Sequence, residues 1–395
     1  MPSILRSTRR HVFKGIAALS LTLLAACDGI AIPTVGGGAS GGPSIDPAAP
    51  VPVALLVPKS SASAGVVGRS LENAARLAVA DLDGVRIDLR VYDTAGDAAR
   101  AGVLAQQAVD DGAKIILGPL FADAAVEASK AVADDGVNVL AFSNNTSIAG
   151  GNLFVLGPTF DSSATRLVSF AAAQGKRRGL VVFSQDAEGQ VGRQAIETAA
   201  AGSAFDVVGA IGFEPSVAGV TGAVASAASA VQSQGADAIF FTSNPAGGLS
   251  YLAEGLPGRG VRSPDQQFMG LGRWDVPASA LDLPGLQNGW FTLPDTAADQ
   301  SFRSRYNAAY GAAPHQLGGL AFDGIAAVGA LVKARGRSAL TGGALTQSAG
   351  FQGTSGVFRL LPDGTNQRGL AVATIRDRRV VILDPAPRAF GGAGF

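Results

Sequence analysis

Short apolar runs alternate with helical stretches along most of this chain, and that alternation limits the folds it can adopt. The first run, 53–57, is apolar at every position, and the stretch that follows it, 66–82, carries apolar residues on one side. Strands that are apolar on both faces need helices on both faces, which is typical of parallel sheets. The same reasoning predicts strands at 87–92, 114–117, 137–142, 180–183, 207–211, 238–242 and 267–271, and helices at 98–109, 123–134, 162–173, 191–201, 220–234 and 248–256.

The alternation is interrupted at Gly157-Pro158 and then resumes, which indicates two α/β units of similar size. The folded part is long enough to hold two domains. The predicted fold class is therefore α/β, with two doubly wound parallel-sheet lobes.

The N-terminal segment 1–26 has the order of a secretory signal. Basic residues come first, and an apolar stretch, 16–26, leads to Cys27, the only cysteine. This arrangement resembles the lipobox of bacterial lipoproteins, in which the cysteine becomes the lipidated first residue. A membrane-spanning anchor is the alternative, but the apolar run is shorter than the roughly 20 residues that a span requires. Arg9-Arg10 also resembles a twin-arginine signal, so the export route and the target membrane stay open.

The segment 27–50 is rich in Gly, Pro, Ser and Ala, which predicts a flexible linker between the lipid and the folded part. The whole chain has 31 basic and 31 acidic residues, and four of the basic residues precede Cys27. The chain that starts at Cys27 therefore carries a net charge of −4, which argues against a general nucleic-acid binder. One cysteine allows no intramolecular disulfide, so burial of the core must stabilise the fold.

Several motifs together resemble the type I periplasmic binding-protein superfamily, and its leucine/isoleucine/valine-binding branch in particular. They are Ile-Ile-Leu-Gly-Pro-Leu-Phe at 115–121, Val-Leu-Ala-Phe-Ser-Asn at 139–144, Tyr-Asn-Ala-Ala-Tyr-Gly-Ala-Ala-Pro at 306–314, Ala-Phe-Asp-Gly at 321–324 and the segment 353–364. That branch includes lipoproteins called penicillin-binding-protein activators.

The resemblance implies two lobes joined by three crossings of the chain, near Pro158, Trp290 and Gly350. The expected division puts 51–158 plus 291–350 in lobe 1 and 159–290 plus 351–385 in lobe 2, with 386–395 as a tail. Ligands of such folds bind beyond the carboxyl ends of the strands, between the lobes.

The sequence offers little for catalysis. His315 is the only histidine after the signal segment, and it follows Pro314 in what reads as a surface loop. A Ser-His-Asp triad would depend on that one residue, and a zinc site of Cys and His ligands cannot be assembled. No phosphate-binding Gly-x-x-x-x-Gly-Lys-Ser/Thr loop is present. We therefore expect a binding protein with no cofactor rather than an enzyme.

Candidate ligand-binding residues follow the predicted strands. Ser60, Ser61 and Ser63 precede a helix N-terminus, whose free N–H groups favour an anion such as a ligand carboxylate, although helix capping explains them equally well. A second group follows a strand in the family's ligand loop, and capping is again the alternative. It consists of Ser143, Asn144 and Asn145.

This chain has acidic residues at two positions where the family's amino-acid binders commonly have other residue types. The resemblance places Asp123 where a hydroxyl residue commonly holds the ligand's α-carboxylate, and Glu188, near Asp186, where an aromatic residue often covers the ligand. An acid would repel a carboxylate, so we expect a ligand other than a plain branched-chain amino acid. Trp274 is a further candidate for the cleft, with a place in the core or at the rim as the alternative.

Two functions remain in competition. The leading one is a lipid-anchored periplasmic receptor that binds a small polar ligand, such as an amino acid or derivative, for an ABC permease. The other is an activator lipoprotein that regulates a cell-wall synthase through protein–protein contact. The membrane tether, the acids Asp123 and Glu188, and the Gly-Pro-Leu-Phe and Phe-Ser-Asn motifs favour the second function. The first function is what the resemblance implies, because binding proteins of this kind deliver ligands to ABC permeases.

Overall fold

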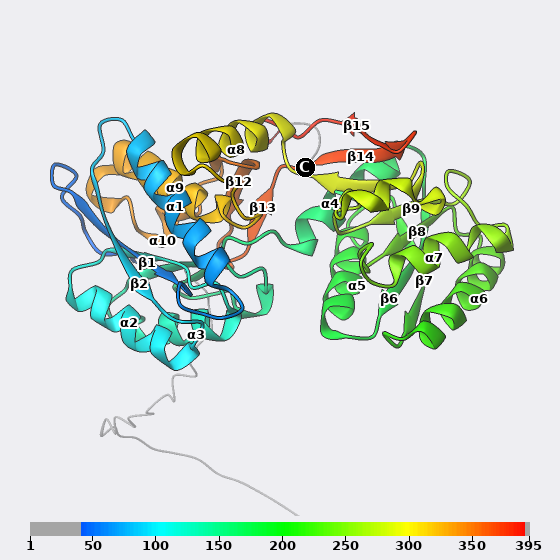
Figure 1. Cartoon of the computed structure of the whole chain (residues 1–395), viewed down its shortest axis with the longest axis horizontal. Helices are drawn as coiled ribbons and strands as arrows, with labels where there is room; N and C mark the ends of the chain where they lie inside the picture. Colours follow the sequence, from blue (N-terminus) through cyan, green and yellow to red (C-terminus); the bar gives the residue numbers. More distant parts are fainter. Residues whose placement is uncertain (1–40, 392–395) are drawn as a thin grey trace, which may run out of the picture. The chain divides into compact units, whose positions relative to one another are not determined.

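The computed structural model describes residues 41–391, which form two α/β lobes (Figure 1). Lobe 1 is built on a five-stranded sheet of order β2-β1-β3-β4-β5, in which every pairing is parallel. Val53 in the central region pairs with Leu89 on one side and Ile115 on the other. The strands are β1 (Val51–Val57), β2 (Ile87–Asp93), β3 (Ile115–Leu117), β4 (Asn138–Ala141) and β5 (Leu153–Val155).

Helices cover both faces of this sheet, as the continuous apolar strands require. Three helices share one core with β1 and β3, and α1 packs closely on α9. They are α1 (Gly65–Asp81), α8 (Thr296–Tyr310) and α9 (Gly319–Arg335). The other face is covered by α2 (Ala98–Asp110) and α3 (Ala122–Ala131), through small residues such as Ala105 and Ala125. Short elements complete the lobe: η1 (Thr146–Ile148), η5 (Gly336–Ser338) and α10 (Gly342–Leu345).

Lobe 2 is built on a seven-stranded sheet of order β15-β14-β10-β9-β8-β6-β7. Strands β6 to β10 pair in parallel, and β14 and β15 extend the sheet as an antiparallel hairpin. The strands are β6 (Arg178–Ser184), β7 (Asp206–Phe213), β8 (Ala238–Phe241), β9 (Gln267–Gly270), β10 (Trp290–Leu293), β14 (Ala371–Arg376) and β15 (Arg379–Asp384).

Four helices cover the two faces of this second sheet. One face carries α4 (Phe160–Ala173) and α5 (Ala187–Ala200), and the other carries α6 (Val217–Gln234) and α7 (Leu249–Gly255). Three short 3₁₀ turns connect the later strands: η2 (Pro257–Arg259), η3 (Ala278–Asp282) and η4 (Pro284–Leu286). The doubly wound parallel sheets predicted from the apolar runs are therefore confirmed.

The lobe boundaries differ from those expected at two of the three crossings. Strand β10 belongs to the sheet of lobe 2, so the second crossing follows Leu293 instead of preceding Phe291. The expected crossing near Gly350 is wrong, because the chain stays with lobe 1 through a small antiparallel sheet. This sheet consists of β11 (Phe351–Gly353), β12 (Gly356–Leu360) and β13 (Asn366–Arg368).

The physical reason for the third boundary is apolar burial. Phe351, Phe358 and Leu360 lie in the same buried cluster as β1 and α9, so the small sheet completes the core of lobe 1. The third crossing is the short connection from Arg368 to Ala371, where β14 joins the sheet of lobe 2.

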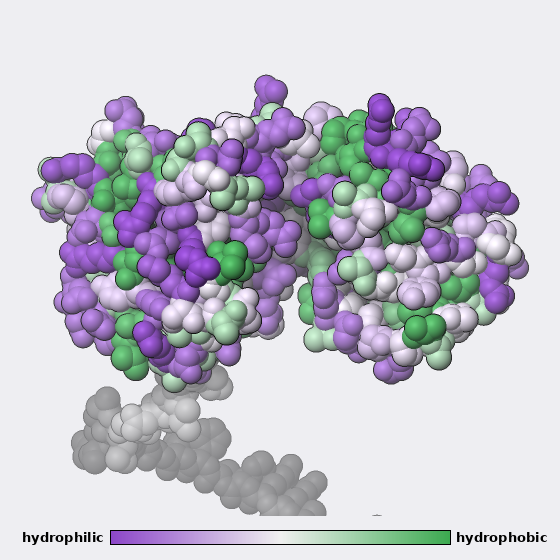
Figure 2. Space-filling model, in the orientation of Figure 1, coloured by the Kyte–Doolittle hydropathy of each residue, from purple (hydrophilic) through white to green (hydrophobic). Residues whose placement is uncertain are grey.

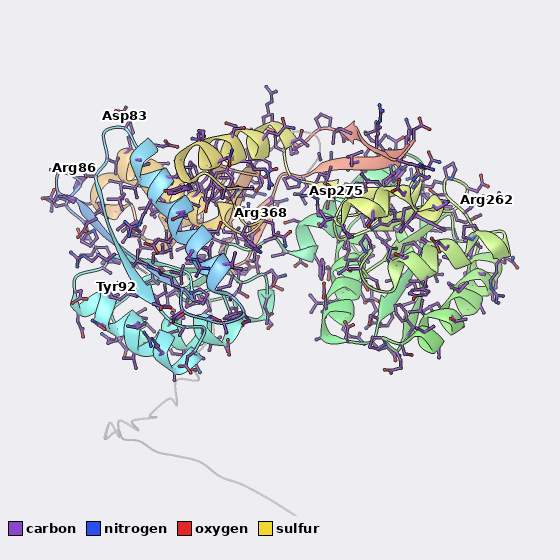
Figure 3. All side chains as sticks on the ribbon, in the orientation of Figure 1. Asp83, Arg86, Tyr92, Arg262, Asp275 and Arg368 are labelled. Carbon is purple, nitrogen blue, oxygen red and sulfur yellow. The ribbon has the colours of Figure 1, made fainter. Side chains whose placement is uncertain are left out.

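Arg368, labelled in Figure 3, connects the three crossings. Its guanidinium donates to Leu156 O, to Ser355 Oγ and to the carboxylate of Asp323, and its backbone N–H donates to Ser162 Oγ. The Ser355 carbonyl in turn accepts from the backbone of Asp295, next to the second crossing. The side chain and backbone N–H of Arg368, together with Ser355, thereby link the segment from Leu156 to the start of α4, the turn before α8 and the end of β13.

The ends of the folded part also differ from the expected linker and tail. Ile45 is buried in the core of lobe 1, and its N–H donates to Arg337 O, so the C-terminal part of the predicted 27–50 linker packs on the fold. At the other end, the Arg359 guanidinium lies over the Phe390 ring, so the tail packs as well. The segment 1–26, Cys27 and the rest of the linker up to residue 40 lie outside the described residues.

Polar side chains cover most of the visible face of each lobe, with apolar residues scattered between them (Figure 2). Between residues 41 and 391, no helix combines the length and the apolar character needed to cross a membrane.

Candidate functional site

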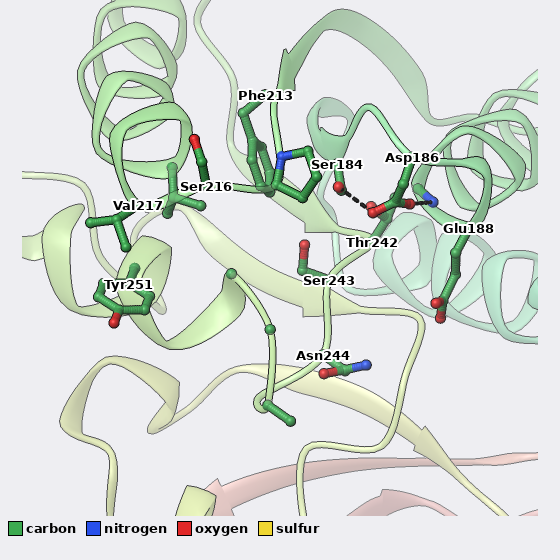
Figure 4. A pocket seen from close by; sticks show the side chains of 16 residues that line it. Ser184, Asp186, Glu188, Phe213, Ser216, Val217, Thr242, Ser243, Asn244 and Tyr251 are labelled. Carbon is green, nitrogen blue, oxygen red and sulfur yellow. Dashed lines mark hydrogen bonds between the residues drawn. The ribbon is translucent and has the colours of Figure 1, made fainter. Parts of the chain in front are cut away.

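A cavity of about 490 Å³ opens in lobe 2, where three neighbouring parallel strands end (Figure 4). Its walls come from the segments that follow β6, β7 and β8, and from the first turns of α5, α6 and α7. Parallel strands bring their carboxyl ends to one edge of the sheet, and ligands of open α/β sheets bind at that edge. The volume is in the range of small-molecule sites.

One end of the cavity is acidic. Asp186 is the N-cap of α5, where its carboxylate accepts from Gly189 N at 2.8 Å and from the Ser184 hydroxyl. The hydrogen bond from Ser184 and the backbone bond from Gly189 hold the pKa of Asp186 below its usual range, so Asp186 is ionised at neutral pH. Glu188 lies in the first turn of the same helix with an exposed side chain.

Hydroxyl and amide groups form the middle of the cavity. Thr242, Ser243 and Asn244 follow β8 directly, and Figure 4 shows Ser243 and Asn244 between the acidic residues and Tyr251. The Thr242 hydroxyl is buried and has no hydrogen-bond partner within the described chain. Among the described residues, no lysine, arginine or histidine lines the cavity.

The other end of the cavity is apolar. Phe213 ends β7, and Val217 and Val220 lie in the first turns of α6, where Ser216 caps the helix by accepting from Gly219 N. Tyr251 of α7 completes this wall (Figure 4).

In lobe 1, the three candidate serines follow β1. Ser61 Oγ accepts from Ala64 N at 3.3 Å, and the Ser60 N–H donates to the carboxylate of Asp93 at the end of β2. Ser63 is exposed and lies with its hydroxyl 3.4 Å from that of Ser61. Ala64 is the N-cap residue of α1 and no side chain of the described residues caps this helix, so Ser61 orders the turn before α1 instead of capping it.

The other lobe 1 candidates follow β3 and β4. Asp123 is exposed in the first turn of α3, and its carboxylate accepts from the backbone N–H of Ala124. Ser143 Oγ accepts from Asn145 N at 3.1 Å, and Asn145 caps η1, while Asn144 is exposed. Capping therefore accounts for the contact of Asn145, while Ser143 closes a local turn just before η1.

The structure thus places the candidates in two groups. The seven residues of lobe 1 lie at the carboxyl ends of β1, β3 and β4, which are neighbours in that sheet. Asp186 and Glu188 lie in the lobe 2 cavity, and none of the seven residues lines that cavity.

Trp274 is not a cleft residue. It is fully buried and stacks on Phe291, with ring centroids 5.9 Å apart. Two glycines make room for the indole: a Cβ on Gly270 would lie 2.0 Å from Trp274 Nε1, and one on Gly289 would lie 2.1 Å from Trp274 Cζ3. The core alternative raised by the sequence is therefore correct for this residue.

His315 has a local structural role. Its N–H donates to Ser70 Oγ, its Nδ1 accepts from Leu317 N, and burial lowers the pKa of the imidazole. The described part of the chain holds no group of three or more His, Cys, Asp or Glu side chains arranged to bind a metal.

Comparison with known proteins identifies the family. A family model described as periplasmic binding protein matches residues 50–379, which is most of the chain. The chain belongs to this family. Members of it are solute-binding proteins, and the resemblance read from the motifs is confirmed. A comparison with curated proteins found no match.

Solved structures share the fold at low sequence identity. A putative branched-chain amino acid ABC transporter protein from Rhodospirillum rubrum aligns with a TM-score of 0.73 and 18% identity, over 85% of this chain and 100% of that one. A branched-chain amino acid ABC transporter periplasmic ligand-binding protein from Burkholderia xenovorans aligns with a TM-score of 0.66 and 18% identity, over 87% of this chain and 97% of that one. A solute-binding protein from R. palustris in complex with benzoate aligns with a TM-score of 0.55 and 18% identity, over 88% of this chain and 99% of that one.

Several cavity residues were missed by the sequence reasoning, although the signal was present. The strands 207–211 and 238–242 were predicted, and the residues that follow them line the cavity. Applying the carboxyl-end rule to every predicted strand would have selected Phe213 and Ser243. Tyr251 carried no comparable signal, because its position depends on how α7 packs.

Proposed function

We propose that this protein is a lipid-anchored periplasmic receptor that binds a small solute between its two lobes and delivers it to an ABC permease. The observation that carries the proposal is the cavity at the carboxyl ends of β6, β7 and β8, which contains carboxylates and no cationic side chain from the part of the chain that the structure describes. Cys27 would carry the lipid that keeps the receptor at the membrane. The related fold of a putative branched-chain amino acid ABC transporter protein and of a solute-binding protein in complex with benzoate supports the same function.

The proposed ligand-binding cleft combines the two groups of candidates. Ser60, Ser61, Ser63, Ser143, Asn144 and Asn145 would supply hydrogen bonds from lobe 1, together with the carboxylate of Asp123. Asp186 and Glu188 would face them from lobe 2. A ligand that contacts both lobes binds the closed form better than the open form. Its binding would therefore shift the equilibrium toward the closed form.

The charges define the class of ligand. Asp123, Asp186 and Glu188 are acidic, so the ligand carries a positive or hydrogen-bond-donating group, as an amino-acid derivative does. A plain leucine would bring its carboxylate close to Asp123, which is unfavourable.

A screen by thermal shift tests this function. The compounds screened are amino acids, small peptides and cell-wall fragments. A true ligand at a hundredfold excess over its Kd raises the free energy of unfolding by about 2.7 kcal/mol. Asp123→Ser is expected to weaken binding, because it removes a charge partner of the ligand. Asp83→Ser is the matched control, since the Asp83 side chain is 98% exposed and precedes β2, at the opposite ends of the parallel strands of lobe 1 from the candidates.

The activator function is the competing outcome of the same screen. The acids Asp123 and Glu188 and the lipid tether are the features that suit it. If no compound in the screen stabilises the protein, and a cell-wall synthase co-purifies with the full chain, the receptor function is overturned in favour of the activator.

A further inference from the structure

The lobe 2 cavity has an acidic end and an apolar end. This difference restricts the chemical class of the ligand more narrowly than a small polar solute. Figure 4 shows Asp186 and Glu188 at one end and Val217 and Tyr251 at the other. Residues from three separate loops converge on a space of about 490 Å³, which is large enough for a molecule that reaches both ends.

The acidic end carries net negative charge even after the helix ends are counted. The N-termini of α5, α6 and α7 each act as about half a positive charge. The two carboxylates of Asp186 and Glu188 outweigh these three half-charges, and no cationic side chain of residues 41–391 lines the cavity. Asp186 and Ser216 also satisfy N–H groups at these helix ends, so fewer donors remain for an anion. The acidic end therefore favours a cation.

The apolar end of the cavity exposes two large apolar side chains to solvent. The Val217 side chain is 65% exposed and that of Tyr251 is 57% exposed, and they flank Phe213 and Val220, which are buried. These four side chains come from β7, α6 and α7 and form one wall of the cavity. Covering such a wall with an apolar group is favourable by about 25 cal/mol per Å².

We propose that this wall is an apolar subsite, so that the ligand is an organic cation with an ammonium group at one end and an aliphatic or aromatic tail at the other. The ammonium group binds at Asp186 and Glu188, and the tail covers Val217 and Tyr251. The inference rests on the proposed function, because it assumes that the cavity is the solute site.

A series of n-alkylammonium ions tests the two ends separately. Binding of ethylammonium, butylammonium and hexylammonium to the full chain is measured by calorimetry, with hexanol as the uncharged comparison and hexanoate as the oppositely charged one. Affinity is expected to rise about fourfold per methylene, which corresponds to ~0.8 kcal/mol. Hexylammonium is expected to bind more tightly than hexanol, and hexanoate more weakly.

Variants assign each effect to its end of the cavity. Val217→Ser combined with Tyr251→Ser is expected to flatten the dependence on chain length and leave the preference for ammonium. Glu188→Gln is expected to reduce the preference for ammonium and leave the dependence on chain length. Val103→Ser is the matched control, because Val103 is 69% exposed on α2 of lobe 1.

The outcomes separate the inference from the proposed function. Affinities that do not change with chain length, with ammonium still preferred, overturn the apolar subsite and leave the receptor function standing. Ammonium ions that bind no better than hexanoate overturn the cation preference and the two-ended ligand together. A chain-length effect that survives in the Val217/Tyr251 variant also overturns the assignment.

Discussion

Replacing Asp323 with asparagine should cost about 3 to 5 kcal/mol of folding free energy, because it breaks a fully buried ion pair. The Asp323 carboxylate is 0% exposed and lies 3.1 Å from Arg368 Nη1, whose side chain is 5% exposed. Burial raises the pKa of Asp323, and the Arg368 charge and the Thr354 N–H oppose that shift. Asparagine keeps an acceptor for Thr354 N–H but leaves the guanidinium charge unpaired in the core, so the lower part of the range is expected for Asp323→Asn.

Urea unfolding measures this cost, with Glu127→Gln as the control. Glu127 pairs with Lys130, and both side chains are largely exposed, so the control should cost no more than about 1 kcal/mol. Removing both charges, with Asp323→Leu and Arg368→Met together, should cost less than Asp323→Leu alone, because no unpaired buried charge remains. If Asp323→Asn destabilises no more than Glu127→Gln, the argument that Arg368 holds the crossings through this pair is refuted.

Three further predictions concern the anchor, the core and the response to acid. Cys27→Ala should abolish labelling by a fatty-acid probe, and labelling that persists would contradict the lipoprotein assignment. Gly270→Ala should destabilise the protein by about 1 to 3 kcal/mol and alter its near-ultraviolet circular dichroism, because the new Cβ would overlap Trp274; an unchanged spectrum would contradict that packing. Burial raises the pKa of Asp93, but hydrogen bonds from Ala95 and Ser60 outweigh it and hold the pKa below its usual range. Ionised Asp93 therefore stabilises the fold above about pH 4, and this stability is lost as the pH falls further. Asp93→Asn should make unfolding less sensitive to acid in that range, and identical acid profiles for the two proteins would refute it.

The sequence predicted the strands of the two sheets well where they form continuous apolar runs. β1 and β8 lie within a few residues of the predicted ranges, because burial on both faces leaves a pattern that local residues show directly. β10 and the small sheet β11–β13 were not assigned to their lobes correctly. Their membership depends on which core Phe291 and Phe358 enter, and that choice is set by packing between distant segments.

The candidate site was predicted less completely for similar reasons. Asp186 and Glu188 follow a predicted strand, and the structure places both in the lobe 2 cavity. Trp274 also follows a predicted strand, but Gly270 and Gly289 form a slot that holds its indole in the core. Those glycines become informative only when the fold brings both of them against the same indole ring.

Closure of the lobes around a ligand is the central claim, and a distance measurement between the lobes tests it most directly. Spin labels on cysteines introduced at Val103 of α2 and Val191 of α5 would report the distance, in a chain whose Cys27 is replaced by alanine. Both positions are exposed, at 69% and 47%, and they lie in different lobes. The tightest ligand from the thermal-shift screen should shorten the mean distance in the wild-type site and have a weaker effect in Asp123→Ser. A distance distribution that stays unchanged at saturating ligand would contradict the account of this protein as a receptor that binds its solute between two closing lobes.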